Sequence, residues 1–306
     1  MRVPLSLACG AYDRTFALAR GDIQPEGIDL TYLTYLALPV EETFFRMTRH
    51  REFDAAEMSP SSYLISLEAG APFVAIPAFV SRAFRHNGIY VSPASITAPA
   101  GLAGRVMGLA EYQLTANVWI RGILAERHGL PVAAVRYRTG GLHEPGRVAK
   151  LAHDPPPGVD IEPIPPGATL ADMLAAGQID ALYTPRVPRT FGHKGVRRLF
   201  TDPRGEEERY FATTGIFPVM HVVVLRREVY EPRPWLAQSL YKAFEQARRE
   251  AAARLAETAA GASLLPWAYA DAERTQNVMG QTSGPTAWPG TSRRCARSSG
   301  TPSSRA

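Results

Sequence analysis

Apolar runs of strand length alternate with amphipathic stretches along most of the chain, which is the pattern of an α/β protein. Strands are predicted at residues 3–9, 28–35, 53–59, 71–80, 104–110, 135–141 and 179–185. Helices are predicted at residues 39–53, 60–70, 115–129, 169–178 and 232–257. Acidic side chains near the start of the first of these helices, and glycine at the ends of the next two, support their boundaries.

The composition is that of a globular protein, because 45% of the 306 residues are hydrophobic and 21% are charged. This length is enough for two ordinary domains or one large one. No apolar stretch reaches the roughly 18 residues that a membrane span requires. The N-terminal segment MRVPLSLACGAYDRT is more typical of a first strand and loop than of a signal peptide, so we expect a cytoplasmic protein. Two cysteines, Cys9 and Cys295, are too few for a disulfide framework, a zinc ribbon or an iron–sulfur site.

The positive charge is concentrated at the C-terminal end. Residues 281–306 contain four arginines and no acid, which leaves +1 of the net charge of +5 for residues 1–280. A nucleic-acid surface would need basic residues on a structured face, so no nucleic-acid partner is expected. The same segment is rich in Ser, Thr, Pro and Gly, and we predict that it is either a disordered tail or the product of a frameshift.

Seven polar loops follow the apolar runs, at residues 10–15, 57–62, 81–86, 111–117, 139–147, 183–190 and 214–221. Ligands of open α/β sheets bind outside the carboxyl ends of strands, where these loops are expected. The common nucleotide-binding, zinc-protease and nucleophile-elbow motifs are missing from the sequence. No cluster of ligands predicts a metal site.

The loops contain two kinds of group that bind anions. Arginines able to bind a carboxylate through two parallel hydrogen bonds are Arg14, Arg82, Arg85 and Arg186. Helix-start residues, beside backbone N–H groups that favour an anion, are Ser59, Ser61, Gln113 and Thr115. His86 and His221 are the candidate proton-transfer residues, because imidazole titrates near neutral pH. Taken singly, a serine at a helix start is most often an N-cap, and an arginine after a strand is most often solvated.

Ten segments carry a resemblance to one family. They read YDRT, PEGIDL, EETFFRM, REFDAAEMSPSSYL, AIPAFVSRAFRHNGIYV, EYQLTANVWIRGIL, TGGLHEPGR, DMLAAGQIDAL, TGIFPVMH and SLYKAFEQAR. In this order they resemble the 4,5-dihydroxyphthalate decarboxylase family, from about residue 1 to about residue 280. The resemblance stops there, and this departure favours the frameshift interpretation of the tail.

The resemblance implies a type II periplasmic-binding-protein-like α/β fold with two lobes, each a mixed sheet flanked by helices. Residues 1–90 and 196–280 would form the first lobe, residues 91–195 the second, and residues 281–306 the tail. The ligand would lie between the lobes.

The resemblance also implies a cofactor-independent decarboxylation of a small aromatic dicarboxylate, with no membrane partner. We predict His86 as the acid that protonates the ring carbon, and His221 as its partner or as the base. Arginines and helix starts would bind the carboxylates. The alternatives are a solute-binding protein without catalysis and an enzyme acting on another aromatic or heterocyclic acid. Homo-oligomerisation is left open.

Overall fold

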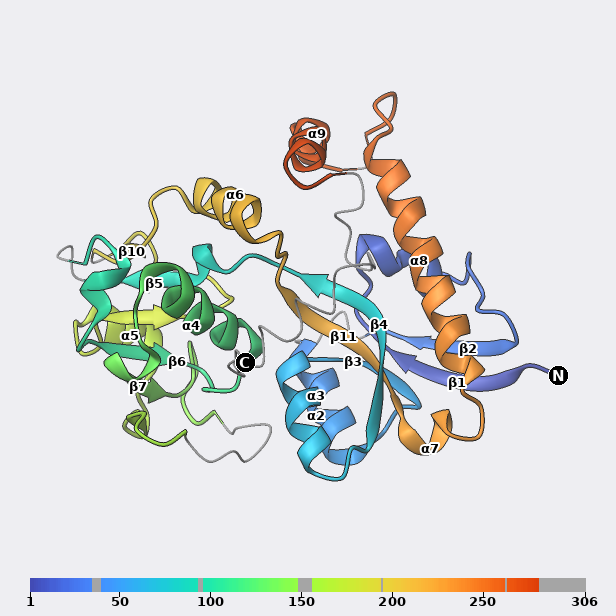
Figure 1. The fold of residues 1–306 in the computed structure, drawn as a ribbon, viewed down its shortest axis with the longest axis horizontal. Helices are drawn as coiled ribbons and strands as arrows, with labels where there is room; N and C mark the ends of the chain where they lie inside the picture. Colours follow the sequence, from blue (N-terminus) through green and yellow to red (C-terminus); the bar gives the residue numbers. More distant parts are fainter. Residues whose placement is uncertain (35–39, 93–95, 148–155, 194, 262, 281–306) are drawn as a thin grey trace, which may run out of the picture. The chain divides into compact units, whose positions relative to one another are not determined.

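The computed structural model describes residues 1–34, 40–92, 96–147, 156–193, 195–261 and 263–280 (Figure 1). They form two compact units, residues 1–83 with 215–280 (unit 1) and residues 84–214 (unit 2). The tail predicted at residues 281–306 lies outside the described residues. None of the helices in the described part has the length and apolar character needed to span a bilayer.

Unit 1 contains a five-stranded sheet in the order β2-β1-β3-β11-β4. Its strands are β1 (Val3–Ala8), β2 (Ile28–Leu33), β3 (Ala55–Met58), β4 (Phe73–Arg82) and β11 (Val219–Arg226). β1 runs parallel to β2 and β3, whereas β11 is antiparallel to both of its neighbours. The last strand of this sheet, β11, therefore follows all of unit 2 in the sequence.

Helices cover both faces of this sheet (Figure 1). The helices of unit 1 are η1 (Asp13–Thr15), α1 (Phe16–Ala19), α2 (Val40–His50), α3 (Pro60–Glu68), α7 (Arg227–Tyr230), α8 (Trp235–Leu255) and α9 (Ala268–Met279), of which α9 packs on α8. On one face, Leu240 and Phe244 of α8 pack with Leu7 and Val223 of the sheet. On the other face, Met47 of α2 packs in a separate apolar cluster. Burial of both faces explains why the strands read as nearly continuous apolar runs.

Unit 2 contains a six-stranded sheet in the order β10-β5-β9-β6-β7-β8. Its strands are β5 (Ile89–Val91), β6 (Val106–Leu109), β7 (Arg136–Thr139), β8 (Ile161–Pro163), β9 (Ala181–Tyr183) and β10 (Arg197–Arg198). Its helices are η2 (His86–Gly88), η3 (Pro99–Leu102), α4 (Thr115–His128), η4 (Val132–Ala134), α5 (Leu170–Ala175) and α6 (Pro203–Thr214). α4 and α5 pack in different apolar clusters with the sheet. Two α/β units, each a mixed sheet flanked by helices, confirm the expected fold class.

The division between the units follows strand pairing. The resemblance implies crossings after residues 90 and 195, and the compact units of the structure divide after Ala83 and after Thr214. β5 pairs with β9 and β10, so it belongs to the second sheet from its first residue. α6 packs against η2 and stays with that unit as well.

His86 lies in the interior of unit 2. Its side chain is 2% exposed and packs against the rings of Phe200 and Tyr210, with centroids 5.7 and 5.3 Å away. Its Nδ1 atom is buried and has no hydrogen-bond partner among the residues that the structure describes. Burial lowers the pKa of His86 to about 4, nearby His128 adds to the shift, and Glu206 opposes it.

We expect this histidine to make unit 2 sensitive to acid. In the unfolded chain the imidazole takes up a proton near pH 6.5, whereas in the folded chain it does so only near pH 4. The contribution of the neutral His86 to the free energy of unfolding is therefore complete above pH 6.5 and is lost as the pH falls toward 4. It amounts to about 1.4 kcal/mol per unit of pKa shift, or roughly 3 kcal/mol in all. Urea unfolding of wild type and of His86→Leu across this pH range measures how steeply the unfolding free energy of each protein changes with pH.

His193→Leu is the matched control, because His193 is exposed. It should leave the slope of unfolding free energy against pH unchanged. A slope for His86→Leu equal to that of the wild type would show that His86 does not titrate in this way.

Candidate functional site

The carboxyl ends of three strands meet at one edge of the sheet in unit 1. β3 and β4 run antiparallel to β11, and β1 runs parallel to β3. The last residues of these three strands therefore lie at the same edge of the sheet as the first residues of β11. Gly10, Ser59 and Arg82 therefore gather near His221. Loops at this edge of an open sheet are the usual place for a ligand site.

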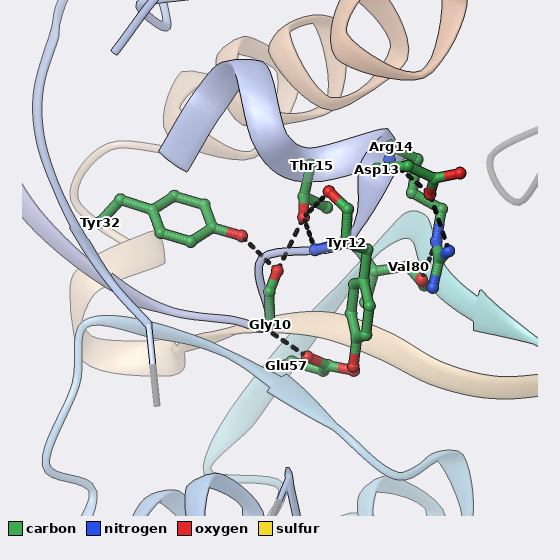
Figure 2. A network of polar contacts seen from close by, with 8 residues as sticks. All are labelled: Gly10, Tyr12, Asp13, Arg14, Thr15, Tyr32, Glu57 and Val80. Carbon is green, nitrogen blue, oxygen red and sulfur yellow. Dashed lines mark hydrogen bonds and ion pairs between the residues drawn. The ribbon is translucent and has the colours of Figure 1, made fainter. Parts of the chain in front are cut away.

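The buried carboxylate of Glu57 is the centre of this edge, with an exposed fraction of 0%. One of its oxygens accepts hydrogen bonds from the backbone N–H of Gly10 at 3.0 Å and from the thiol of Cys9 at 3.6 Å. The other accepts from the hydroxyl of Tyr12 at 2.7 Å and lies 2.5 Å from Nδ1 of His221. Figure 2 shows Gly10 and Tyr12 meeting Glu57 from the loop after β1.

These contacts keep the carboxylate ionised. Burial by itself would raise the pKa of Glu57, but the charge of His221 and the hydrogen bonds from His221, Gly10 and Tyr12 outweigh it and lower the pKa. The pKa of Tyr12 is raised by burial and by Glu57, and the pKa of the Cys9 thiol is raised for the same reasons. Both groups therefore stay protonated and act as donors.

His221 is oriented by its neighbours. An ionised carboxylate only accepts hydrogen bonds, so Nδ1 of His221 carries a proton and Nε2 is the nitrogen that can exchange one with a ligand. The ring of Phe44 packs edge-on against the imidazole at a centroid distance of 4.9 Å. This arrangement restricts the imidazole on two sides.

The pairing of β4 with β11 is irregular beside His221. Val223 pairs with Ile76, but His221 pairs with Ser81, so the register shifts between them. Pro77 lies in this interval and has no N–H group to donate to a neighbouring strand. Such irregularities are frequent next to functional sites, where they redirect a side chain.

The loop after β1 is fixed by contacts to Gly10. Its carbonyl accepts hydrogen bonds from the hydroxyls of Thr15 at 2.7 Å and Tyr32 at 2.9 Å (Figure 2). A Cβ atom on Gly10 would lie only 2.6 Å from the ring of Tyr12. Glycine is therefore required here for the Tyr12 ring to reach Glu57.

Two of the predicted arginines line one hollow of unit 1. Arg14 donates from Nε to the carbonyl of Val80 at 2.5 Å, pairs with Asp13 at 3.1 Å, and lies 4.2 Å from the ring centroid of Tyr12 (Figure 2). Arg14 and Arg82 both border a hollow of about 400 Å³. The structure thus brings these two predicted arginines together.

The predicted serines act at a helix start. The hydroxyl of Ser59 caps α3 by accepting from the N–H of Ser62 at 3.4 Å, and it lies 3.0 Å from the hydroxyl of Ser61. This is the ordinary role of serine at this position.

Five predicted residues belong to unit 2 and are described only within that unit. Burial lowers the pKa of Arg85 to about 10, with Glu207 opposing the shift. Gln113 donates to the Glu111 carboxylate at 3.2 Å, and Thr115 is buried in the first turn of α4. Arg186 is exposed. The fifth residue is His86, whose burial and low pKa leave it neutral at physiological pH, so its environment does not favour the predicted acid role.

Glu57 and Tyr12 are site residues that the sequence pattern did not single out. The available signal was an acidic residue within the apolar strand AAEM, because glutamate is rarely buried without partners. Among the described residues, no group of three or more His, Cys, Asp or Glu is placed to hold a metal ion.

A buried carboxylate that orients a histidine at a carboxyl sheet edge is typical of proteins that bind a small molecule and exchange a proton with it. No model of a known protein family matches the chain. It is 39% identical over 284 residues to the 4,5-dihydroxyphthalate decarboxylase of Comamonas testosteroni, covering 92% of this chain and 85% of that protein. It is 42% identical over 214 residues to the protein of the same name from Pseudomonas putida, covering 69% and 82%. The chain belongs to the 4,5-dihydroxyphthalate decarboxylase family.

Solved structures resemble the chain in fold. The periplasmic aliphatic sulphonate binding protein SsuA from Escherichia coli has a TM-score of 0.49 at 15% identity, covering 89% of this chain and 84% of its own. The Candida albicans CA3427 gene product, described as having the generic periplasmic binding protein fold, has a TM-score of 0.48 at 10% identity, covering 90% and 80%.

We expect Gly10→Ala to destabilise unit 1. The added methyl group would push the Tyr12 ring away from Glu57, and such overpacking costs about 1–3 kcal/mol. Urea unfolding measures the loss. Gly122→Ala is the control, because no described atom apart from its chain neighbours and its own helix backbone lies within 4 Å of its Cβ position in α4, and alanine favours a helix by about 0.5–1 kcal/mol. Equal stability of Gly10→Ala and wild type would contradict the close approach of Tyr12.

Proposed function

We propose that the chain is a carboxy-lyase that converts 4,5-dihydroxyphthalate to protocatechuate and CO2 without an organic cofactor. One observation carries the activity: the 39% identity to a protein of that name across 92% of the chain. The proposal includes a cytoplasmic location and a small aromatic dicarboxylate as the partner.

The reaction needs a proton at the ring carbon that bears the departing carboxylate. Direct loss of CO2 would leave an aryl anion with no orbital that can delocalise the charge. Protonation of that carbon, with transfer of the para hydroxyl proton to solvent water, gives a dienone instead. When the carbon–carboxylate bond breaks, its electron pair enters the ring, the dienone oxygen becomes a phenolate, and that oxygen takes up a proton. The balance is one proton consumed and one CO2 released.

His221 is the proposed proton donor to the ring carbon. The ionised Glu57 carboxylate, 2.5 Å from Nδ1, stabilises a positively charged imidazolium and fixes its orientation. Nε2 then presents the transferable proton. Glu57 is a positioning residue in this scheme, and Tyr12 and Gly10 position Glu57 in turn.

Arg14 and Arg82 are the proposed carboxylate-binding residues of unit 1, supported by their common hollow. The residues of unit 2, namely Arg85, Gln113, Thr115 and Arg186, stay predictions as substrate contacts, and so do Ser59 and Ser61. The acid role predicted for His86 passes to His221, because His86 is buried and its pKa is about 4.

Purified protein incubated with 4,5-dihydroxyphthalate should release CO2 and form protocatechuate in equal amounts. His221→Gln should lower kcat by about 10²–10⁴-fold with little change in KM, because it removes the proton donor and leaves the carboxylate contacts intact. Product formation followed by chromatography, with CO2 trapped in parallel, measures both parameters.

His50→Gln is the control, since His50 is exposed at the end of α2. It should retain wild-type turnover. A wild-type protein that binds the dicarboxylate without releasing CO2 would favour the solute-binding alternative and contradict the proposed activity. Full turnover by His221→Gln would contradict the proposed role of His221 but not the proposed activity.

A further inference from the structure

The hollow bordered by Arg14 and Arg82 is also lined by residues of α8 and α9, to which the proposed reaction assigns no role. It lies wholly within unit 1, and its volume of about 400 Å³ is in the range of small-molecule sites. The wall residues come from η1, the end of β4, the segment before β11, α8 and α9, and they include Arg14, Arg82, Phe217, Arg248, Asp271 and Ala272. α9 follows the C-terminal end of α8 (Figure 1).

The guanidinium groups of Arg14 and Arg248, which line this hollow, are held by hydrogen bonds. Glu245 accepts two hydrogen bonds from Arg248, at 3.0 and 2.7 Å. Arg14 is held by the Val80 carbonyl and by Asp13 (Figure 2). Cations that are already positioned lose less conformational entropy when a carboxylate binds.

The space between the walls suits a flat ring. Four alanines among the wall residues leave the hollow open on the helix side. Phe217 offers an aromatic surface, and its ring centroid lies 5.9 Å from the guanidinium carbon of Arg82. An aromatic acid could therefore contact Phe217 through its ring and an arginine through its carboxylate.

The α9 wall adds a preference for hydroxyl groups. Asp271 carries a carboxylate that accepts hydrogen bonds and repels other carboxylates. A ligand that presents only carboxylates would meet this repulsion, whereas a phenolic hydroxyl can donate to Asp271. The wall therefore combines recognition of an acid with recognition of a phenol.

We propose that this hollow is a binding site for a hydroxylated aromatic acid, with Arg82 and Arg248 facing its carboxylate and Asp271 its hydroxyl groups. The inference rests on the proposed function for the class of ligand, and it adds Arg248 and the α9 residues to the determinants of specificity. Two contacts connect the hollow with Glu57: Arg14 lies over the ring of Tyr12, and the hydroxyl of Tyr12 donates to Glu57.

The test fills the hollow without removing a charge. Ala272→Trp places a large ring inside it, and Ala270→Trp places the same ring on an exposed position of α9 outside the wall. Protocatechuate binding is measured by isothermal titration calorimetry, after circular dichroism has shown that both variants are folded. We expect Ala272→Trp to raise Kd by about tenfold or more, which is about 1.4 kcal/mol, and Ala270→Trp to leave it unchanged.

A second comparison tests the role of Asp271. Wild type should bind protocatechuate more tightly than benzoate, and Asp271→Asn should reduce that preference by about threefold or more, since the charged acceptor is replaced by a neutral amide oxygen. An unchanged preference would overturn the assignment of Asp271. Equal Kd values in both tryptophan variants, or no binding of protocatechuate by the wild type, would overturn the site itself.

These outcomes separate the site from the reaction. Binding that Ala272→Trp weakens, in a protein that releases no CO2, would support the site and refute the proposed activity. Turnover with an unchanged KM in Ala272→Trp would support the activity and refute the site.

Discussion

The ionised Glu57 carboxylate inside unit 1 is the interaction on which the site depends. A buried charge without partners would be unstable, and this one is stabilised by donors from the loop after β1 and from β11. His221 lies 164 positions away in the sequence, so a single side chain joins the start of the chain to its return from unit 2. Loss of the charge would release the loop and the imidazole together.

The same constraint links the fold to the chemistry. β11 completes the sheet as an antiparallel strand, and its first residues therefore lie where β1, β3 and β4 end. An imidazole placed there receives its orientation from a carboxylate that is shielded from water. Arg14 extends the arrangement outward, because it packs on Tyr12 and borders the hollow that α8 and α9 close. Proton transfer and recognition of the acid would thus depend on the same buried carboxylate and the residues packed around it.

Much of the fold could be predicted from the sequence, because strand and helix patterns are local. The helix predicted at residues 115–129 is α4, and the strand predicted at 71–80 overlaps β4, which spans Phe73–Arg82. α6 was not predicted, since PRGEEERYFATT has no clear apolar stripe and buries only Tyr210. His221 was found because it is a histidine in a predicted polar loop, whereas Glu57, at the start of the loop predicted at residues 57–62, was not singled out. His86 follows a strand in the same way, yet it packs in an interior that no local pattern reveals.

The coupling between Glu57 and His221 can be measured directly in a double-mutant cycle on kcat. Glu57→Gln alone should lower kcat by about 10–100-fold, because the neutral amide no longer stabilises the imidazolium. If Glu57 acts only through His221, the double variant Glu57→Gln/His221→Gln should be no slower than His221→Gln alone. Losses that multiply in the double variant would show that the two residues act independently, and would contradict the central claim.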